Sequence, residues 1–252
     1  MTKRKKRWIM WIAILLLSAI MRFPGSDWDG GFALHPDERY LLDLSSKITV
    51  YGDPCSIDPQ YSSGHVPLNV VRLLFPPSNG VDALYPARLL SGIIGVLLVA
   101  ITGASGQALG KEITGWFSAL AIVFAPLLVQ NARFYTVDTM ATTAATLAVL
   151  AVLHKRWGIA GISGAVAIAS KISLIWVWPV LVLSVFWRGG STSAVKTKFP
   201  TSLRTLFVLA GWGGLTYVVT SPWMLINPSQ CWLGPMIQWQ VVTGRIIYPY
   251  TL

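Results

Sequence analysis

Long apolar stretches of this chain alternate with short segments that carry charged and aromatic residues. A helix needs about 20 residues to cross the hydrocarbon core of a bilayer, and shorter helices are tolerated inside a bundle. The pattern therefore predicts an all-α polytopic membrane protein with about seven transmembrane helices. The expected spans are residues 8–23, 87–109, 114–130, 137–154, 157–170, 172–187 and 203–221. Because Lys171 separates the fifth span from the sixth, these two form either a hairpin or one kinked helix.

Two segments outside the spans are predicted to lie at the membrane surface. The first connection, residues 24–86, is the longest, and apolar residues recur in it at helical spacing between Tyr40 and Ile48. This spacing predicts an amphipathic interfacial helix over residues 36–50. The tail, residues 222–252, is rich in Trp and Tyr, which favour the depth of the lipid headgroups.

The composition supports a membrane solvent. Hydrophobic residues make up 54% of the 252 residues and charged residues only 12%, which is more apolar surface than one water-soluble core would bury. The net charge of +10 lies in short clusters between apolar runs and forms no continuous basic face, so no nucleic-acid partner is expected. We expect one transmembrane module, residues 1–221, followed by the interfacial tail, with membrane lipids around the module.

The charges also predict the orientation. Five basic residues at positions 3–7 precede the first apolar stretch, and no small-residue cleavage site follows it, which predicts a retained first helix. With this end in the cytoplasm, 12 Lys and Arg fall inside and 8 outside, as the positive-inside rule requires. Nine of the ten acids fall outside, and only Glu112 falls inside. The predicted location is the inner (plasma) membrane, with the first loop and the tail outside.

The cysteines and histidines give few chemical signals. Cys55 and Cys231 both fall on the predicted outer side, where an oxidising compartment permits a disulfide, and two unpaired thiols are the other interpretation. Two cysteines and three scattered histidines show no zinc-site spacing, so no metal site is predicted.

The first candidate for chemistry is a pair of adjacent acids. Asp37 and Glu38 follow His35 and Pro36 at the start of the predicted surface helix. These acids could serve catalysis, with His35 as a further candidate beside them. The alternative is structural, because proline at the first helical position and acids in the first turn are typical of a plain helix start.

Three more charged residues lie at the outer ends of predicted spans. Arg133 and Asp138 share a short outer connection, and Lys171 is alone in an otherwise uncharged run. An ammonium group in the hydrocarbon centre costs about 2.5–3.5 kcal/mol, so Lys171 should face a cavity, a partner or the interface. The structural alternatives are a helix cap for Asp138 and snorkelling for the two cations. Acids beside cations at a lipid surface suit the handling of a phosphate-bearing lipid, with a base that activates a nucleophile.

The order of several short motifs resembles a known family. A Pro-Asp-Glu motif at 36–38, Tyr-Pro-Ala-Arg-Leu at 85–89, an Ala-Arg to Asp segment at 132–138 and Ala-Ser-Lys at 169–171 follow one charged first helix. This order resembles the polyprenyl-phosphate-sugar-dependent glycosyltransferases of the GT-C type, in particular the protein O-mannosyltransferase and aminoarabinose-transferase-like family. The resemblance covers essentially the whole chain.

The resemblance implies a function and roles for the candidate residues. The implied enzyme moves a sugar from a polyprenyl-phosphate carrier to a hydroxyl-bearing acceptor on the outer side, with inversion. It makes Asp37 the catalytic base, with Glu38 its neighbour and Asp138 the acid of the second loop. It makes Arg133 and Lys171 the residues that hold the carrier phosphate. No cofactor follows with certainty, and a divalent metal is left open.

The length of the chain suggests a second interpretation. Enzymes of this family usually continue through several more helices, whereas this sequence ends about where the next helix should begin. The chain would then correspond to the N-terminal half of such an enzyme. The alternative to a transferase is a non-catalytic relative that serves as a structural or assembly subunit, with other membrane subunits as its partners.

Overall fold

The computed structural model describes residues 2–75, 83–186 and 199–246, and these ranges contain helices and loops but no strand. The predicted all-α class is confirmed for this part of the chain. The longer helices are α1 (Lys3–Arg22), α5 (Leu84–Leu109), α6 (Glu112–Val123), α8 (Val137–Leu153), α9 (Trp157–Ser170), α10 (Val177–Phe186) and α11 (Phe199–Thr220). The shorter ones are α2 (Pro36–Lys47), α3 (Pro54–Ile57), α4 (Val66–Leu74), α7 (Pro126–Arg133), η1 (Ile172–Trp176), α12 (Trp223–Ile226), α13 (Pro228–Cys231) and α14 (Leu233–Val242).

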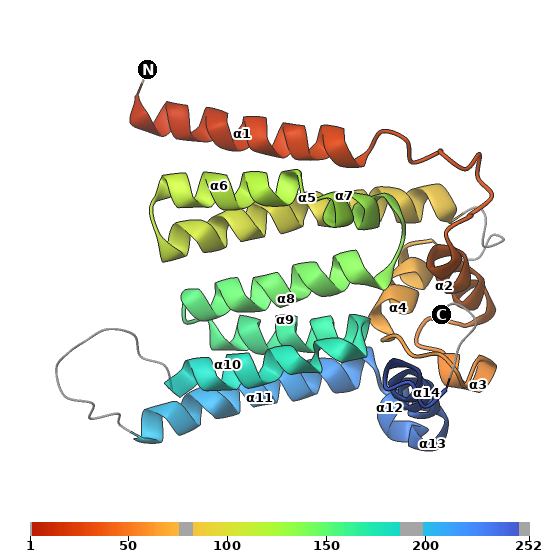
Figure 1. Cartoon of the computed structure of the whole chain (residues 1–252). Helices are drawn as coiled ribbons and strands as arrows, with labels where there is room; N and C mark the ends of the chain where they lie inside the picture. Colours follow the sequence, from red (N-terminus) through yellow and green to blue (C-terminus); the bar gives the residue numbers. More distant parts are fainter. Residues whose placement is uncertain (1, 76–82, 187–198, 247–252) are drawn as a thin grey trace.

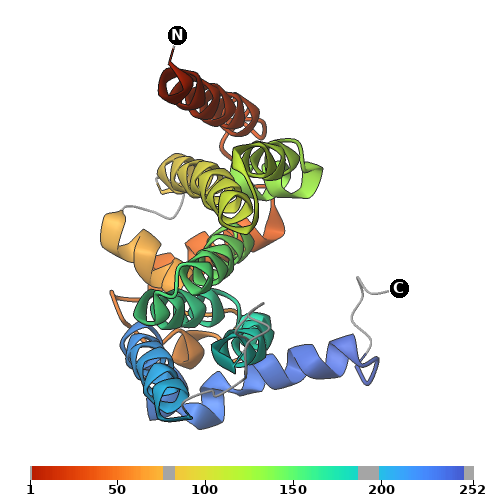
Figure 2. The same ribbon diagram turned by 90° about the vertical axis from the view of Figure 1, so that its left-hand side faces the viewer.

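The longer helices lie side by side, and the short helices α2–α4 and α12–α14 gather at one end of them (Figure 1). Helix α5 packs against α6 and α8, α8 packs against α9, and α9 packs against α11, while α1 covers α5 and α6. Figure 2 shows the same stack turned by a quarter turn. Because successive long helices run in opposite directions, every second connection returns to the end that carries the short helices.

Helices α9 and α10 form a hairpin, which settles the alternative that the sequence left open. Lys171 has extended backbone angles (φ −146°, ψ 112°) and ends α9, and the chain then runs back through η1 into α10 (Figure 1). On the other side of α9, Gly161 lies so close to α11 that a Cβ atom would come within 2.3 Å of the carbonyl oxygen of Leu209. The missing side chain therefore allows α9 and α11 to touch.

The third predicted span is broken at Pro126. Helices α6 and α7 meet there at 61°. Proline has no N–H, so in a continuous helix it would leave the Ile122 carbonyl, four residues earlier, without a partner. The buried guanidinium of Arg22 in α1 donates to this carbonyl at 2.9 Å from Nη2. A side chain of α1 thus satisfies the backbone group that the proline frees.

Among the described residues, two helices are long and apolar enough to cross a membrane, namely Leu84–Leu109 and the segment Ser202–Thr220 of α11. The bent pair of α6 and α7 would make a third. The remaining predicted spans are helices, but α8, α9 and the η1–α10 segment are shorter, and α1 begins with five basic residues. The candidate spans are consistent with a membrane protein, and the number seven stays a prediction.

Helix α2 confirms the predicted helix after Pro36 but not its expected surroundings. Leu41 and Leu44 are 3% exposed and pack in a core cluster with Leu68 and Tyr135. The apolar face of α2 therefore meets α4 and the start of α8 rather than the membrane surface. This happens because α4 presents an apolar face of its own to it.

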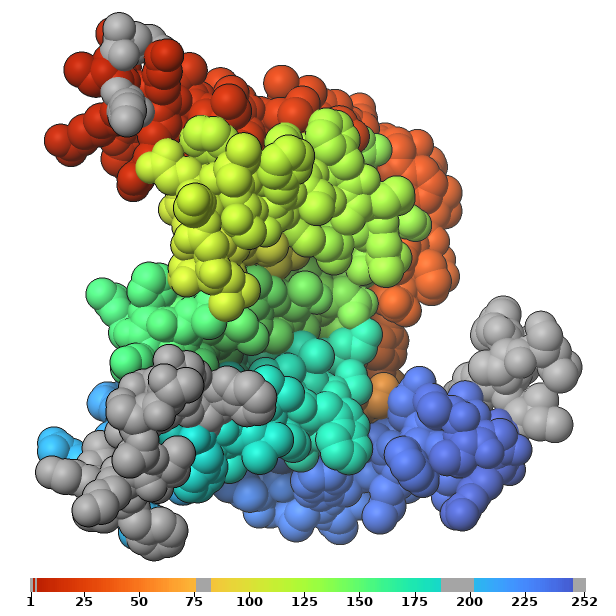
Figure 3. All heavy atoms as spheres, turned by 60° about the vertical axis from the view of Figure 1, so that its left-hand side comes forward, coloured from red at the N-terminus to blue at the C-terminus, as the bar shows by residue number. Residues whose placement is uncertain are grey.

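The tail after α11 forms a lobe beyond the ends of α10 and α11 (Figure 3). Helices α12–α14 expose large apolar side chains, among them Trp232 (44% exposed) and Trp239 (63%). Such exposure agrees with the predicted interfacial tail. Tyr248 and Tyr250, which belong to the same prediction, lie outside the described residues.

Candidate functional site

A cavity of about 800 Å³ lies at the end of the bundle that carries the short helices. Asp37 of α2, Asp138 of α8 and Lys171 between α9 and η1 all line it. Trp176 of η1 and Trp239 of α14 contribute to an apolar wall. Three of the charged residues singled out from the sequence, which lie far apart along the chain, therefore share one cavity.

Asp37 is the uncommitted acid of this cavity. It directly follows Pro36 in the first turn of α2, where backbone N–H groups and the helix dipole favour a negative charge. Its side chain is exposed. Within the described ranges it forms no ion pair or side-chain hydrogen bond, so its carboxylate is available to accept a proton.

Asp138 and Lys171 form an ion pair inside the cavity. The distance between Lys171 Nζ and Asp138 Oδ1 is 2.5 Å, and the two side chains are 42% and 32% exposed. Asp138 lies in the first turn of α8 and Lys171 at the end of α9, so each charge also has the favourable sign for its helix end. An ammonium group has three donors, and this pair uses one of them. Lys171 can therefore bind an anion in the cavity while it keeps its partner.

Glu38 takes part in a buried cluster instead of lining the cavity. Its carboxylate accepts hydrogen bonds from Arg88 of α5, at 2.9 Å and 3.1 Å from Nε and 2.6 Å from Nη2, and from the Tyr135 amide at 2.8 Å. Arg88 also pairs with Asp29 at 2.7 Å, and all three ionic side chains are fully buried. The hydrogen bonds from Arg88 hold the pKa of the Asp29 carboxyl well below its usual range. The cluster joins α2, α5 and the connection before α8, and so positions Asp37 and Asp138.

Arg133 and His35 also lie outside the cavity lining. The guanidinium of Arg133 donates to the carbonyl oxygen of Met21 at 3.0 Å. Met21 lies in the last turn of α1, whose carbonyls lack partners within their own helix. The ring of His35 stacks on Phe134 with centroids 4.4 Å apart. The structure thus gives both residues contacts that support the fold near the cavity.

The rest of the cavity wall includes α14 of the predicted interfacial tail and a loop with Ser62 and Ser63 that the sequence did not single out. Gly64 donates its N–H to the carbonyl of Ser170 at 3.1 Å, which holds the loop with Ser62 and Ser63 beside Lys171. The tail is tied to α3, which precedes this loop, by a disulfide between Cys55 and Cys231. Of the two interpretations of these cysteines, the structure shows the disulfide. The contact between Gly64 and Ser170 joins residues more than a hundred positions apart and leaves no local pattern in the sequence.

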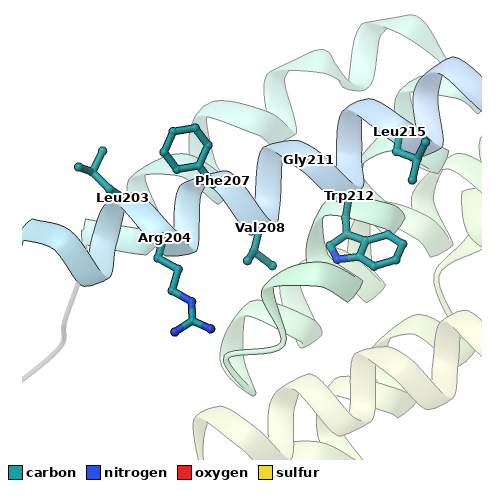
Figure 4. A pocket seen from close by; sticks show the side chains of 7 residues that line it. All are labelled: Leu203, Arg204, Phe207, Val208, Gly211, Trp212 and Leu215. Atoms are coloured by element: carbon teal, nitrogen blue, oxygen red, sulfur yellow. The ribbon is translucent and has the colours of Figure 1, made fainter.

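A second, shallower groove of about 610 Å³ runs along α11 (Figure 4). Its lining is apolar apart from Arg204, and Phe207 on it is 75% exposed. Figure 4 shows Arg204, Val208 and Trp212 on one side of the helix. The groove has no carboxylate among its lining residues, so it suits contact with lipid tails or another helix rather than acid–base chemistry.

Comparisons with protein-family models, with curated proteins and with solved structures find no match for this chain.

Proposed function

We propose that this chain is a membrane glycosyltransferase of the GT-C type, which moves a sugar from a polyprenyl-phosphate carrier to a hydroxyl acceptor. The observation that carries the proposal is the meeting of Asp37, Asp138 and Lys171 in one cavity. A free carboxylate beside a paired ammonium is the combination that such a transfer needs, namely a base for the acceptor and a cation for the phosphate.

In the proposed reaction, Asp37 takes the proton of the acceptor hydroxyl as its oxygen attacks the anomeric carbon. The bond between that carbon and the carrier phosphate breaks, and the phosphate leaves with the electron pair. Lys171 stabilises the negative charge that develops on the phosphate, and Asp138 holds the ammonium in place. One displacement occurs, so the configuration inverts. Arg133 reaches the phosphate only if it leaves the Met21 carbonyl, so Lys171 is the principal phosphate contact in this mechanism.

The surroundings of the cavity support a lipid-linked donor. Its wall includes Ile175, Trp176 and Val242, whose side chains are 49%, 76% and 74% exposed. An apolar wall next to the ammonium suits a prenyl chain whose phosphate binds at Lys171. In the same proposal the seven longer segments of the bundle cross the inner membrane, with α1 entering from the cytoplasm and the cavity at the outer surface.

The test compares two conservative substitutions on α2. Asp37→Asn removes the proposed base, whereas Asp43→Asn changes an exposed acid that pairs with Lys47. With purified protein in vesicles and a polyprenyl-phosphate mannose or aminoarabinose donor, we expect Asp37→Asn to lower the transfer rate by about 10²–10⁴-fold. Asp43→Asn should transfer at the wild-type rate. Lys171→Ala should raise the donor concentration at which the transfer rate saturates. Equal rates for wild type and Asp37→Asn would refute the mechanism.

A non-catalytic subunit of a larger membrane complex is the second candidate. The observation that favours it is the apolar face of α11, where only 11% of the apolar window Ser202–Thr220 is buried. A partner helix could cover this face. Under this alternative the native protein co-purifies with other membrane proteins in fixed ratio, and Asp37→Asn leaves the assembly and its activity unchanged.

A further inference from the structure

Two cysteine sulfur atoms and an imidazole meet at a buried point outside the cavity. Cys55 of α3 and Cys231 of α13 are each 1% exposed, and His65, which precedes α4, is 3% exposed. One ligand atom from each of the three residues lies within 4.8 Å of the others. The two sulfur atoms are joined in a disulfide that links positions 176 residues apart.

The disulfide gives the buried imidazole of His65 no hydrogen-bond partner for its Nδ1 atom. Its Nε2 lies 3.9 Å from Cys55 Sγ, and its Nδ1 is buried without a hydrogen-bond partner in the described structure. Burying an imidazole in this way is unfavourable unless a ligand or water completes its contacts.

A carboxylate lies beside the two cysteines. Asp53 Oδ1 lies 3.8 Å from Cys231 Sγ and accepts the Cys55 amide at 2.9 Å. Two thiolates, one imidazole and one carboxylate or water are typical ligands of tetrahedral Zn²⁺. The surrounding cluster, which includes Met224, is apolar.

We propose that Cys55, His65 and Cys231 bind one Zn²⁺ ion when the disulfide is reduced, with Asp53 nearest to the fourth position. Two sulfur ligands of one zinc ion lie roughly 3.8 Å apart. The Cα atoms of the two cysteines are 5.1 Å apart, so rotation of the side chains can reach this separation. The ligands come from three distant stretches, which explains why no zinc spacing is visible in the sequence.

A dithiol is the reductant that opens the disulfide in this proposal. The dithiol supplies two electrons and two protons, the S–S bond breaks, and the reductant closes into its own disulfide. Binding of Zn²⁺ then displaces both thiol protons as two Zn–S bonds form. Zinc itself changes no oxidation state. In either form α3 stays linked to α13, so the tail that forms part of the cavity wall keeps its attachment.

The experiment titrates the reduced full-length protein in detergent with Zn²⁺ and, separately, with Co²⁺ as a spectroscopic probe. We expect one equivalent of bound Zn²⁺ by mass spectrometry of the metal, and a cobalt spectrum with thiolate charge-transfer and tetrahedral bands. His65→Ala should weaken binding by at least about 100-fold, more than loss of an outer-shell partner costs. His154→Ala, at the exposed end of α8, is the matched control and should bind as the wild type does.

A second measurement needs no variant. Bound zinc should slow alkylation of both cysteines in the reduced wild-type protein, and a chelator should restore the rate. The proposal is wrong if the reduced protein binds no zinc, or if His65→Ala binds it as tightly as the wild type. The outcome is independent of the transferase proposal, because the site does not line the cavity and the readout is metal binding.

Discussion

Replacing Glu38 by glutamine tests whether the buried cluster holds α2 in place. The substitution keeps the shape of the side chain and removes its charge. Glu38 now accepts three close contacts from Arg88 and one from the Tyr135 amide. A glutamine can offer only one oxygen to these donors, and its amide nitrogen is itself a donor. At least one N–H group in a fully buried place therefore loses its acceptor.

The size of the effect follows from burial and from the remaining charge. Breaking a fully buried ion pair by removing one partner costs about 3–5 kcal/mol. In Glu38→Gln, Arg88 keeps its other partner, Asp29, so we expect the lower end, about 3 kcal/mol. Arg88→Met leaves two buried carboxylates without a cation, and we expect about 5 kcal/mol or more. The exposed pair of Asp43 and Lys47, with side chains 56% and 54% exposed, is worth less than about 1 kcal/mol, so Asp43→Asn serves as the control.

The assay measures the helix content of the purified variants by circular dichroism, while the mole fraction of a denaturing detergent in the mixed micelles is increased. The expected order of destabilisation is Arg88→Met, then Glu38→Gln, then Asp43→Asn, which should unfold close to the wild type. If Glu38→Gln is no less stable than Asp43→Asn, the carboxylate of Glu38 is not buried against Arg88. The docking of α2 on α5, and with it the position of Asp37, would then be wrong.

Two further predictions concern the same end of the molecule. The pKa of Asp29 is lowered in the folded protein. The ionised Asp29 therefore stabilises the fold fully above the usual carboxyl pKa of about 3.9, and this contribution is lost as the pH falls below that value. In the same unfolding assay, the stability of Asp29→Asn should thus fall less steeply below pH ~4 than the stability of the wild-type protein. Gly64→Ala would place a Cβ atom within 2.1 Å of the Ala169 carbonyl oxygen and should lower the free energy of unfolding by about 1–3 kcal/mol. Gly211→Ala in α11 is the control, because a Cβ atom there would have no neighbouring side chain within 4 Å. Thermal unfolding should show this variant to be as stable as the wild type or more stable.

Most of the helical bundle could be predicted from the sequence, because a helix in an apolar environment leaves a long apolar run. The predicted spans 87–109 and 157–170 correspond closely to α5 and α9. The break at Pro126 and the hairpin at Lys171 depend on the neighbouring segments that bond to the backbone groups left unpaired where a helix ends. The sequence of one span does not show which segments these are. For the same reason the surface helix 36–50 was expected at the lipid interface, although its apolar face in fact packs on the protein.

Part of the candidate site could also be predicted. Alternating helices bring their ends to the same side, and this rule placed Asp37, Glu38, Arg133, Asp138 and Lys171 on one side of the membrane. Of these five residues, Asp37, Asp138 and Lys171 line the cavity. The rule could not separate Asp37 from Glu38, because successive residues of a helix point about 100° apart and only the packing decides which one is buried. The partner Arg88 carries a weak signal, a single cation in the first turns of a long apolar helix.

The cavity depends on segments that the bundle does not contain, and this has a consequence for its stability. Gly234 lies against the loop so closely that a Cβ atom would come within 2.3 Å of the Tyr61 carbonyl oxygen. The same loop is bonded to Ser170 through Gly64, and the tail is joined to α3 by Cys55 and Cys231. Each contact involves the loop or the short helices at this end of the molecule, so losing any one of them would shift a cavity wall while the core of the bundle stays packed. Function at this site should therefore fail at smaller perturbations than folding does.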